Sequence, residues 1–193
     1  MELVFCTNNQ HKLKEVGEIL GTSFSYLTLN DIGYFDDIPE PYETLAENSF
    51  TKANQVFQQT GKNCFSEDTG LFIEALNAEP GVYSARYAGE HSNAQNNMDK
   101  VLLKLKDVEN RNAYFKTVVT LILNGEKIQF DGICNGVIAL NQSGVEGFGY
   151  DPIFIPEGHD VTFAEITSSE KNAISHRKKA FDKLAEYLLS ISK

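Results

Sequence analysis

Two adjacent carboxylates, Glu67 and Asp68, stand in the segment SEDTGL directly after a short apolar run. We expect two short strands here, with an acidic turn between them. Paired carboxylates at the end of a strand can hold Mg²⁺ or take a proton from a water molecule. Glu40, in an earlier Pro-rich loop, is a candidate third carboxylate. The pattern indicates metal or acid–base chemistry, although a solvated acidic turn has the same residues.

A cluster of amides and basic residues, TNNQHK at residues 7–12, follows an apolar run at residues 3–6. Apolar residues at helical spacing come next, so a strand leads directly into a helix. The N-terminus of a helix favours an anion, and Asn8 or Asn9 can cap it. Lys12 lies one turn in, where its ammonium group can reach a phosphate. The pattern is not a P-loop, and an ordinary Asn-capped helix with a solvated lysine has the same residues.

The segment GFGYDPIF places two glycines around Phe148 and follows them with Tyr150 and Asp151. Glycines beside an aromatic residue allow its ring to approach a flat ligand closely. The Asp151 carboxylate can accept hydrogen bonds from ring N–H groups. The alternative is a Gly-rich turn whose aromatic side chains pack into the core.

Four basic residues, His176, Arg177, Lys178 and Lys179, occupy the expected first turn of the last helix. Cations at this end oppose the helix dipole, at about 0.3–1 kcal/mol each when exposed. An anionic or electron-rich ligand would offset that cost. Side chains that extend into water would also reduce it, so both interpretations remain.

Two further basic residues are candidates for ligand contacts. Asn48 and Lys52 are one helical turn apart and are expected to face away from an apolar stripe, free for a ligand. That stripe comprises Ala46, Phe50, Ala53 and Phe57. Arg86 lies in the Gly-bounded aromatic segment GVYSARYAG.

The elements expected around these residues are a mixture of strands and helices. Asn124-Gly125 is a strong hairpin signal. The last helix is expected to start after Ser175 and to bury Phe181, Leu184, Leu188 and Ile191. We expect strands at 3–6 and 23–29 and further helices at 9–20, 43–60 and 93–106. The mixture predicts an α/β fold with a mixed β-sheet flanked by helices.

Composition limits the class of protein. The length of 193 residues suits a single domain over residues 1–193. Seventeen Lys and Arg against 27 Asp and Glu give a net charge of −10, which argues against a nucleic-acid polymer as partner. No apolar run reaches a membrane span and the start of the chain does not resemble a signal peptide. Three dispersed cysteines suit buried thiols in a reducing compartment, so we expect a cytoplasmic protein.

Five segments, taken in order, resemble the inosine triphosphate pyrophosphatase family, the noncanonical purine nucleoside triphosphate pyrophosphatases. They extend from residue 7 to residue 177, so nearly the whole chain is covered. The segments are TNNQHK at 7–12, SEDTGL at 66–71, PGVYSARYAG at 80–89, GFGYDPIF at 147–154 and EKNAISHR at 170–177.

The resemblance implies an elongated α/β fold of two lobes with a central cleft, assembled as a homodimer. It also implies Mg²⁺-dependent hydrolysis of a purine nucleoside triphosphate, namely ITP, dITP or XTP, to the monophosphate and pyrophosphate. Asp68 would be the general base and a metal partner, and Glu40 a metal-binding carboxylate.

The resemblance also assigns the residues that contact substrate. The triphosphate contacts would be Thr7, Asn8, Asn9, Gln10, His11, Lys12, Lys52 and Arg86, and Thr69 would also contact substrate. The base pocket would comprise Phe148, Gly149, Tyr150, Asp151, Lys171, His176 and Arg177. The helix-dipole argument suggested phosphate for His176 and Arg177, and we follow the resemblance instead. Asn8 stands where many members have Gly, and Glu67 where Asp is common.

Two other functions fit parts of the same pattern. A related pyrophosphatase acting on other modified nucleotides would differ in the stretch 148–151. A non-catalytic nucleotide-binding protein should lack a carboxylate that activates water, and Asp68 with Glu40 argues against it.

Overall fold

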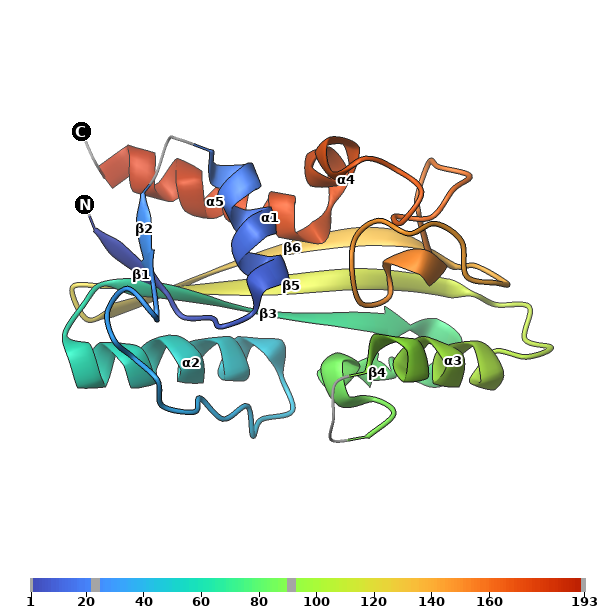
Figure 1. Cartoon of the computed structure of the whole chain (residues 1–193), viewed down its shortest axis with the longest axis horizontal. Helices are drawn as coiled ribbons and strands as arrows, with labels where there is room; N and C mark the ends of the chain where they lie inside the picture. The colour runs from blue at the N-terminus through green and yellow to red at the C-terminus, as the bar shows by residue number, and fades with distance from the viewer. Residues whose placement is uncertain (1, 22–24, 90–92, 192–193) are drawn as a thin grey trace. The chain divides into compact units, whose positions relative to one another are not determined.

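The computed structural model describes residues 2–21, 25–89 and 93–191 (Figure 1). The helices are α1 (Gln10–Leu20), α2 (Leu45–Thr60), α3 (Ala94–Lys104), α4 (Ser168–Ile174) and α5 (His176–Ile191). The strands are β1 (Leu3–Phe5), β2 (Tyr26–Thr28), β3 (Cys64–Ile73), β4 (Pro80–Gly81), β5 (Asn112–Leu123), β6 (Glu126–Ile138) and β7 (Phe154–Pro156). Short 3₁₀ turns are η1 (Glu74–Leu76), η2 (Ser84–Arg86) and η3 (Asp151–Ile153).

The strands form one mixed sheet in the order β2-β1-β3-β5-β6-β7, and β4 pairs with β3. β1 is parallel to both β2 and β3, with Val4 opposite Cys64. β4 is antiparallel to β3, and β7 is antiparallel to β6. Asn124 and Gly125 join β5 to β6 with φ values of 52° and 86°, as their type predicts. The predicted mixed α/β fold is confirmed.

The chain divides into two compact units. Unit 1 comprises residues 1–68, 117–132 and 177–193, and unit 2 comprises residues 69–116 and 133–176. The boundary crosses β3, β5 and β6 within the strands and separates His176 from Arg177. The number of units agrees with the two lobes that the resemblance implies.

Unit 1 has an apolar cluster on each face of its strands. Side chains alternate along a strand, so Leu3 and Phe5 face α1 and α5, whereas Val4 and Cys6 face α2. Figure 1 shows α2 on one side of these strands and the blue α1 with the red α5 on the other. Three layers result, and each residue of β3 in this unit must therefore face one cluster or the other.

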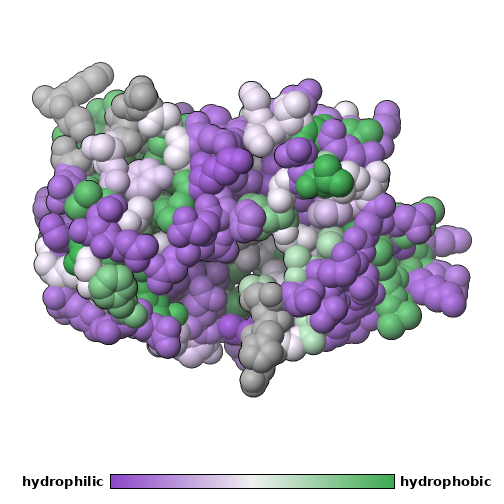
Figure 2. Space-filling view, in the orientation of Figure 1, coloured by the Kyte–Doolittle hydropathy of each residue, from purple (hydrophilic) through white to green (hydrophobic). Residues whose placement is uncertain are grey.

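Unit 2 has one apolar cluster that is rich in aromatic rings. Phe115 contacts Phe154 with ring centroids 4.7 Å apart, and Phe154 contacts Phe163 at 5.2 Å. Residues of α3, including Met98 and Val101, complete this cluster. The face in Figure 2 is mostly hydrophilic with small hydrophobic patches, as expected when the apolar residues are enclosed.

Several predicted details are wrong. The buried face of α2 includes Asn48 and Lys52, which are 0% and 7% exposed. Asn48 is not free for a ligand: its Oδ1 accepts from the Tyr42 N–H and its Nδ2 donates to the Tyr42 carbonyl. Periodicity counted only apolar residues and so missed a buried polar face. Ile191 is 44% exposed, because the apolar contacts of α5 end at Leu188.

Two other expectations concern short or masked segments. The strand expected at 23–29 is present as Tyr26–Thr28, and residues 23 and 24 lie outside the described residues. None of the helices within residues 2–21, 25–89 and 93–191 has the length and apolarity that a membrane crossing needs. Cys6, Cys64 and Cys134 are buried free thiols, as their apolar surroundings suggested.

Candidate active site

Glu67 and Asp68 lie in the middle of the continuous strand β3 and not at a turn. They are only 1% and 6% exposed, so the solvated acidic turn is wrong. Consecutive residues of a strand point to opposite faces. Asp68 therefore shares the α2 side with Cys64, and Glu67 shares the α1 and α5 side with Phe65. Burial of two charges needs cations on both sides, and the helices supply them.

On the α2 side, the ammonium group of Lys52 joins two carboxylates. Its Nζ lies 2.5 Å from Glu40 Oε1 and 3.2 Å from Asp68 Oδ1. Among the described residues, Asp68 Oδ2 is a buried oxygen without a hydrogen-bond partner. Burial raises the pKa of Asp68 above its ordinary 3.8, while Lys52 and Lys12 oppose that shift. The carboxylate is therefore a stronger proton acceptor than a solvated aspartate.

On the opposite face, Glu67 joins cations from two helices. Its Oε1 lies 3.3 Å from Lys12 Nζ on α1 and 3.1 Å from Arg177 Nε on α5. Arg177 NH1 also donates to Glu15 on α1. Burial by itself would lower the pKa of Arg177, because it disfavours the charged form. The carboxylates of Glu67 and then Glu15 outweigh this and raise the pKa above its ordinary value. A four-residue charge network, in which Glu67 and Arg177 are buried, therefore holds the start of α5 to α1 and β3.

The segment at residues 7–12 forms the start of α1. Asn9 is the N-cap, and its Oδ1 accepts from His11 N at 3.0 Å and Lys12 N at 3.2 Å. Thr7 Oγ1 accepts from Asn9 N at 3.2 Å. Asn8 is not among the described residues with positive φ, so this turn has no need of glycine there. The predicted Asn cap is confirmed; a fully solvated Lys12 is wrong, because Lys12 pairs with Glu67.

The aromatic loop of unit 2 is closed by a second lysine–aspartate pair. Lys171 Nζ on α4 lies 2.6 Å from Asp151 Oδ2, and both side chains are buried. The same oxygen accepts from Phe148 N at 2.8 Å, and Lys171 lies 4.9 Å from the centre of the Phe148 ring. Gly147 has φ 75°, and a Cβ there would lie 2.1 Å from Asp151 Oδ2. The glycine is therefore required by the close approach of Asp151.

The two aromatic residues of this loop have different environments. Tyr150 is 5% exposed and belongs to the core of unit 2, and its hydroxyl donates to the Ser84 carbonyl at 2.8 Å. Burial raises the pKa of Tyr150 far above its ordinary value. Phe148 is half-buried and follows Gly147, while Gly149 has φ 67°. Of the two rings, Phe148 is therefore the more accessible, and its contact with a ligand stays a prediction.

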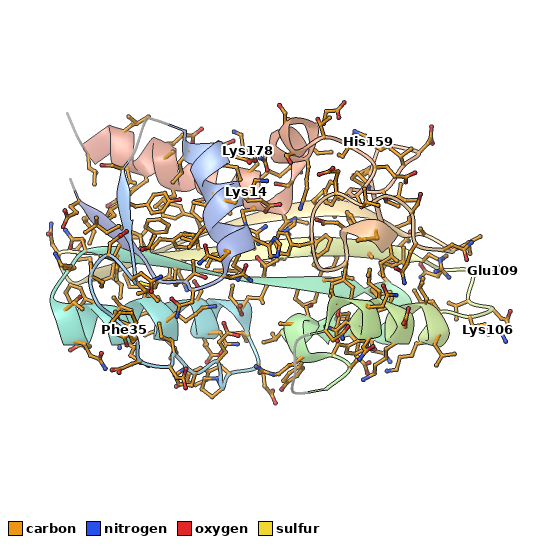
Figure 3. The ribbon with its side chains drawn as sticks, in the orientation of Figure 1. Lys14, Phe35, Lys106, Glu109, His159 and Lys178 are labelled. Carbon is orange, nitrogen blue, oxygen red and sulfur yellow. The ribbon has the colours of Figure 1, made fainter. Side chains whose placement is uncertain are left out.

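The basic residues at the start of α5 do not all extend into solvent. His176 is 2% exposed and stacks on Phe115 with ring centroids 4.6 Å apart, and Arg177 is 2% exposed. Lys178, labelled in Figure 3, pairs with Asp182 one turn later. The solvent alternative is therefore wrong for His176 and Arg177. Contact of Arg177 with a purine base stays a prediction.

Two further predicted substrate contacts, Thr69 and Arg86, belong to unit 2. Thr69 follows Asp68 in β3 and is partly exposed. Arg86 ends η2, is exposed, and lies 5.3 Å from the centre of the Tyr83 ring.

Sequence reasoning missed Glu15 as a partner of Arg177. Glu15 lies three residues after Lys12 in α1, so both face the same side of the helix. That spacing was a usable signal, but Arg177 is 162 residues from Glu15 and no pattern linked them.

The residues fit a divalent cation through Glu40 and Asp68. Among the described residues there is no group of three or more His, Cys, Asp or Glu arranged around a metal. Mg²⁺ commonly uses one or two protein carboxylates together with substrate phosphates. The buried Asp68 Oδ2, without a partner among the described residues, and the partly exposed Glu40 are suitable oxygen donors.

A buried carboxylate with a raised pKa beside lysines has the chemistry that general acid–base catalysis uses. The chain belongs to the Ham1 family, whose family model matches residues 3–187. This confirms the resemblance that the five segments indicated.

The chain is similar to named relatives along almost its whole length. It is 50% identical over 188 residues to the dITP/XTP pyrophosphatase of Flavobacterium johnsoniae, covering 97% of this chain and 98% of the relative. The enzyme of the same name from Flavobacterium psychrophilum is 51% identical over 187 residues, with 97% and 98% covered. The structure of the Staphylococcus aureus Ham1 protein superposes with a TM-score of 0.90 at 34% identity, covering 98% and 99% of the two chains.

Proposed function

We propose that this protein hydrolyses noncanonical purine nucleoside triphosphates, ITP, dITP and XTP, to the monophosphate and pyrophosphate, and so removes them from the nucleotide pool. Family membership and the name dITP/XTP pyrophosphatase of its relatives support the proposal. The structural observation that carries it is the buried Asp68 carboxylate, whose Oδ1 accepts from Lys52 while its Oδ2 has no hydrogen-bond partner among the described residues.

In the proposed reaction, water attacks a phosphorus atom and the bond to the pyrophosphate leaving group breaks. Asp68 takes the proton of that water, which suits its raised pKa. Lys52 holds Asp68 in place and, with Lys12, provides positive charge for the triphosphate. Asn9 orders the N–H groups at the start of α1 beside Lys12.

Glu40 and Asp68 would hold Mg²⁺, which when bound polarises phosphoryl oxygens and offsets charge on the triphosphate. Lys52 now joins these two carboxylates. An ammonium group that joins them offsets their mutual repulsion in the resting protein. Glu40 and Asp68 can therefore lie close together without an uncompensated negative charge.

The base preference follows from the donors of the aromatic loop. Hypoxanthine and xanthine have a carbonyl oxygen where adenine has an amino group, and a lysine or arginine offers only donors. Lys171 lies beside Phe148, the half-buried ring of the loop. If such a donor faces the amino group of adenine, it is left without an acceptor. The cost is about 1–3 kcal/mol of binding free energy, which disfavours ATP. Arg177 is proposed as a second donor, with Glu67 and Glu15 as its partners when no base is bound.

A panel of nucleoside triphosphates, assayed with Mg²⁺ and with excess EDTA, tests the proposal. We expect pyrophosphate release from ITP, dITP and XTP in preference to ATP and GTP, and none in EDTA. Release of orthophosphate, a preference for pyrimidine nucleotides, or binding without turnover would each contradict it and favour one of the other functions.

The family resemblance is also the basis for proposing a cytoplasmic homodimer. The buried free thiols of Cys6, Cys64 and Cys134 suit a reducing compartment. Light scattering of the purified protein would measure its mass, and a monomer at micromolar concentration would refute the dimer.

A further inference from the structure

A buried asparagine on α3, Asn97, contacts the main chain of the segment that carries Arg86. Its Oδ1 accepts from Ala88 N at 2.7 Å. Its Nδ2 donates to the carbonyl oxygens of Ser84 at 3.3 Å and Ala85 at 3.1 Å. Asn97 is 5% exposed, and its bond to the Ser84 carbonyl is buried while the other two are partly buried. One side chain therefore fixes the backbone on both sides of Arg86.

Other contacts fix the same backbone from α3 and from the core of unit 2. Lys100 lies about one turn after Asn97 in α3, and its Nζ donates to the Tyr87 carbonyl at 2.5 Å. Tyr150 donates to the Ser84 carbonyl at 2.8 Å, and Ser84 Oγ accepts from Leu71 N at 2.9 Å. The two residues on each side of Arg86 therefore all have a main-chain hydrogen bond to a side chain. They are Ser84, Ala85, Tyr87 and Ala88.

The Arg86 side chain itself is exposed and lies 5.3 Å from the Tyr83 ring. A guanidinium group that binds a phosphate in a fixed geometry benefits from a rigid backbone. The backbone is then ordered before the ligand binds, so binding carries a smaller entropic cost. Asn97 is also not needed for the apolar packing of α3, which Met98, Val101 and Leu105 provide. Among the described residues, the Asn97 side chain makes its hydrogen bonds with the main chain of the Arg86 segment.

We infer that Asn97 is the positioning residue for Arg86, holding residues 84–88 so that the guanidinium is set for an anionic substrate. The inference rests on the proposed function for the identity of that anion. The rigidity of the segment does not depend on that function and can be measured separately.

The first experiment measures that rigidity by limited trypsin digestion, because Arg86 is an exposed cleavage site in a constrained backbone. We expect Asn97→Ala to increase cleavage after Arg86 by about tenfold or more relative to wild type. Asn96→Ala is the matched control, since Asn96 is the preceding residue of the same helix and is exposed. Equal cleavage of the two variants after Arg86 would overturn the inference.

The second experiment is a double-mutant cycle on ITP hydrolysis. We expect Asn97→Ala and Arg86→Ala each to reduce kcat/KM by about tenfold, and the double variant to lose little more than Arg86→Ala alone. Additive losses would mean that Asn97 acts through general stability, and would overturn the inference. Asn97→Asp keeps the acceptor for Ala88 N and serves if Asn97→Ala does not fold; it should show the same non-additivity.

The two experiments separate the inference from the proposed function. If wild type releases no pyrophosphate from ITP, the proposed function fails, and the trypsin result still decides whether Asn97 holds the segment. If wild type is active but Arg86→Ala is fully active too, the positioning role is overturned while the proposed function stands.

Discussion

Two buried lysine–aspartate pairs, one in each unit, have the same chemistry and different surroundings. In unit 1, Lys52 contacts Asp68 and also Glu40, whose side chain is 32% exposed. In unit 2, Lys171 contacts Asp151, and their side chains are 5% and 4% exposed. The lysine of the first pair therefore also contacts a carboxylate that reaches solvent, whereas both side chains of the second pair are buried.

The Oδ2 atoms of the two aspartates differ as well. Among the described residues, Asp68 Oδ2 is buried without a hydrogen-bond partner, whereas Asp151 Oδ2 accepts from both Lys171 and Phe148 N. The ring of Phe163 also lies near Lys171, at 5.6 Å. Asp68 therefore keeps an oxygen that could accept another partner, whereas Asp151 Oδ2 is bonded to both Lys171 and the main chain of the loop.

The largest effect should come from Asp68→Asn. The amide cannot take a proton from water, so we expect kcat for ITP to fall by about 10²–10⁴-fold. ITP binding, measured by calorimetry, should persist. Asp36→Asn, at an exposed position, is the control. Turnover close to wild type would show that Asp68 does not take part in the reaction. The two lysine–aspartate pairs would then not differ in function.

Replacement of each lysine by methionine tests the two pairs directly for stability. Lys171→Met leaves the Asp151 carboxylate buried and without its cation, at a cost of about 3–5 kcal/mol in the free energy of unfolding. Lys52→Met should cost less, because Glu40 reaches solvent and burial already favours the protonated form of Asp68. Urea unfolding in EDTA measures both. A larger loss in Lys52→Met would reverse the comparison.

Lys12→Ala sharpens the assignment of the unit 1 residues to phosphate. Loss of a charged hydrogen bond of about 1.5–3 kcal/mol should raise KM by at least about tenfold. The rise should be equal for ITP and ATP, which have the same triphosphate. Lys14→Ala is the matched control: Lys14 lies on the same helix, is exposed and is labelled in Figure 3. A change in the ITP/ATP ratio would assign Lys12 to the base instead.

The smallest effect concerns the helix that carries Lys171. The Glu170 carboxylate accepts from Thr167 N in a capping box at the start of α4, which lowers the pKa of Glu170 below its ordinary 4.5. Its stabilisation is therefore present above pH 4.5 and is lost as pH falls through the lowered folded pKa. Glu170→Gln should lower the urea midpoint slightly at neutral pH and match wild type in strong acid. A urea midpoint that stays below that of wild type in acid would contradict this. Glu157→Gln, at an exposed position, is the control.

The ITP/ATP ratio of the Glu170→Gln variant tests whether local order at α4 affects the Lys171 pair. Should Glu170→Gln also change the ITP/ATP ratio, the conformation of the loop would depend on the helix cap as well as on Asp151.

The sequence by itself was sufficient for the class of fold and the family. The hairpin at Asn124-Gly125, the Asn9 cap and the start of α5 after Ser175 depend on residues close together in the chain. Local backbone preferences decide such features, so the pattern of residue types was enough.

The partners of the charged residues were decided by the tertiary structure. Glu67 and Asp68 looked like a turn, because two adjacent acids are costly in a buried strand unless distant cations compensate them. Their cations come from α1, α2 and α5, and Arg177 is 110 residues from Glu67. Asn48 and Asn97 were equally hidden, since periodicity describes which face of a helix is apolar and says nothing of which main chain a buried amide will meet.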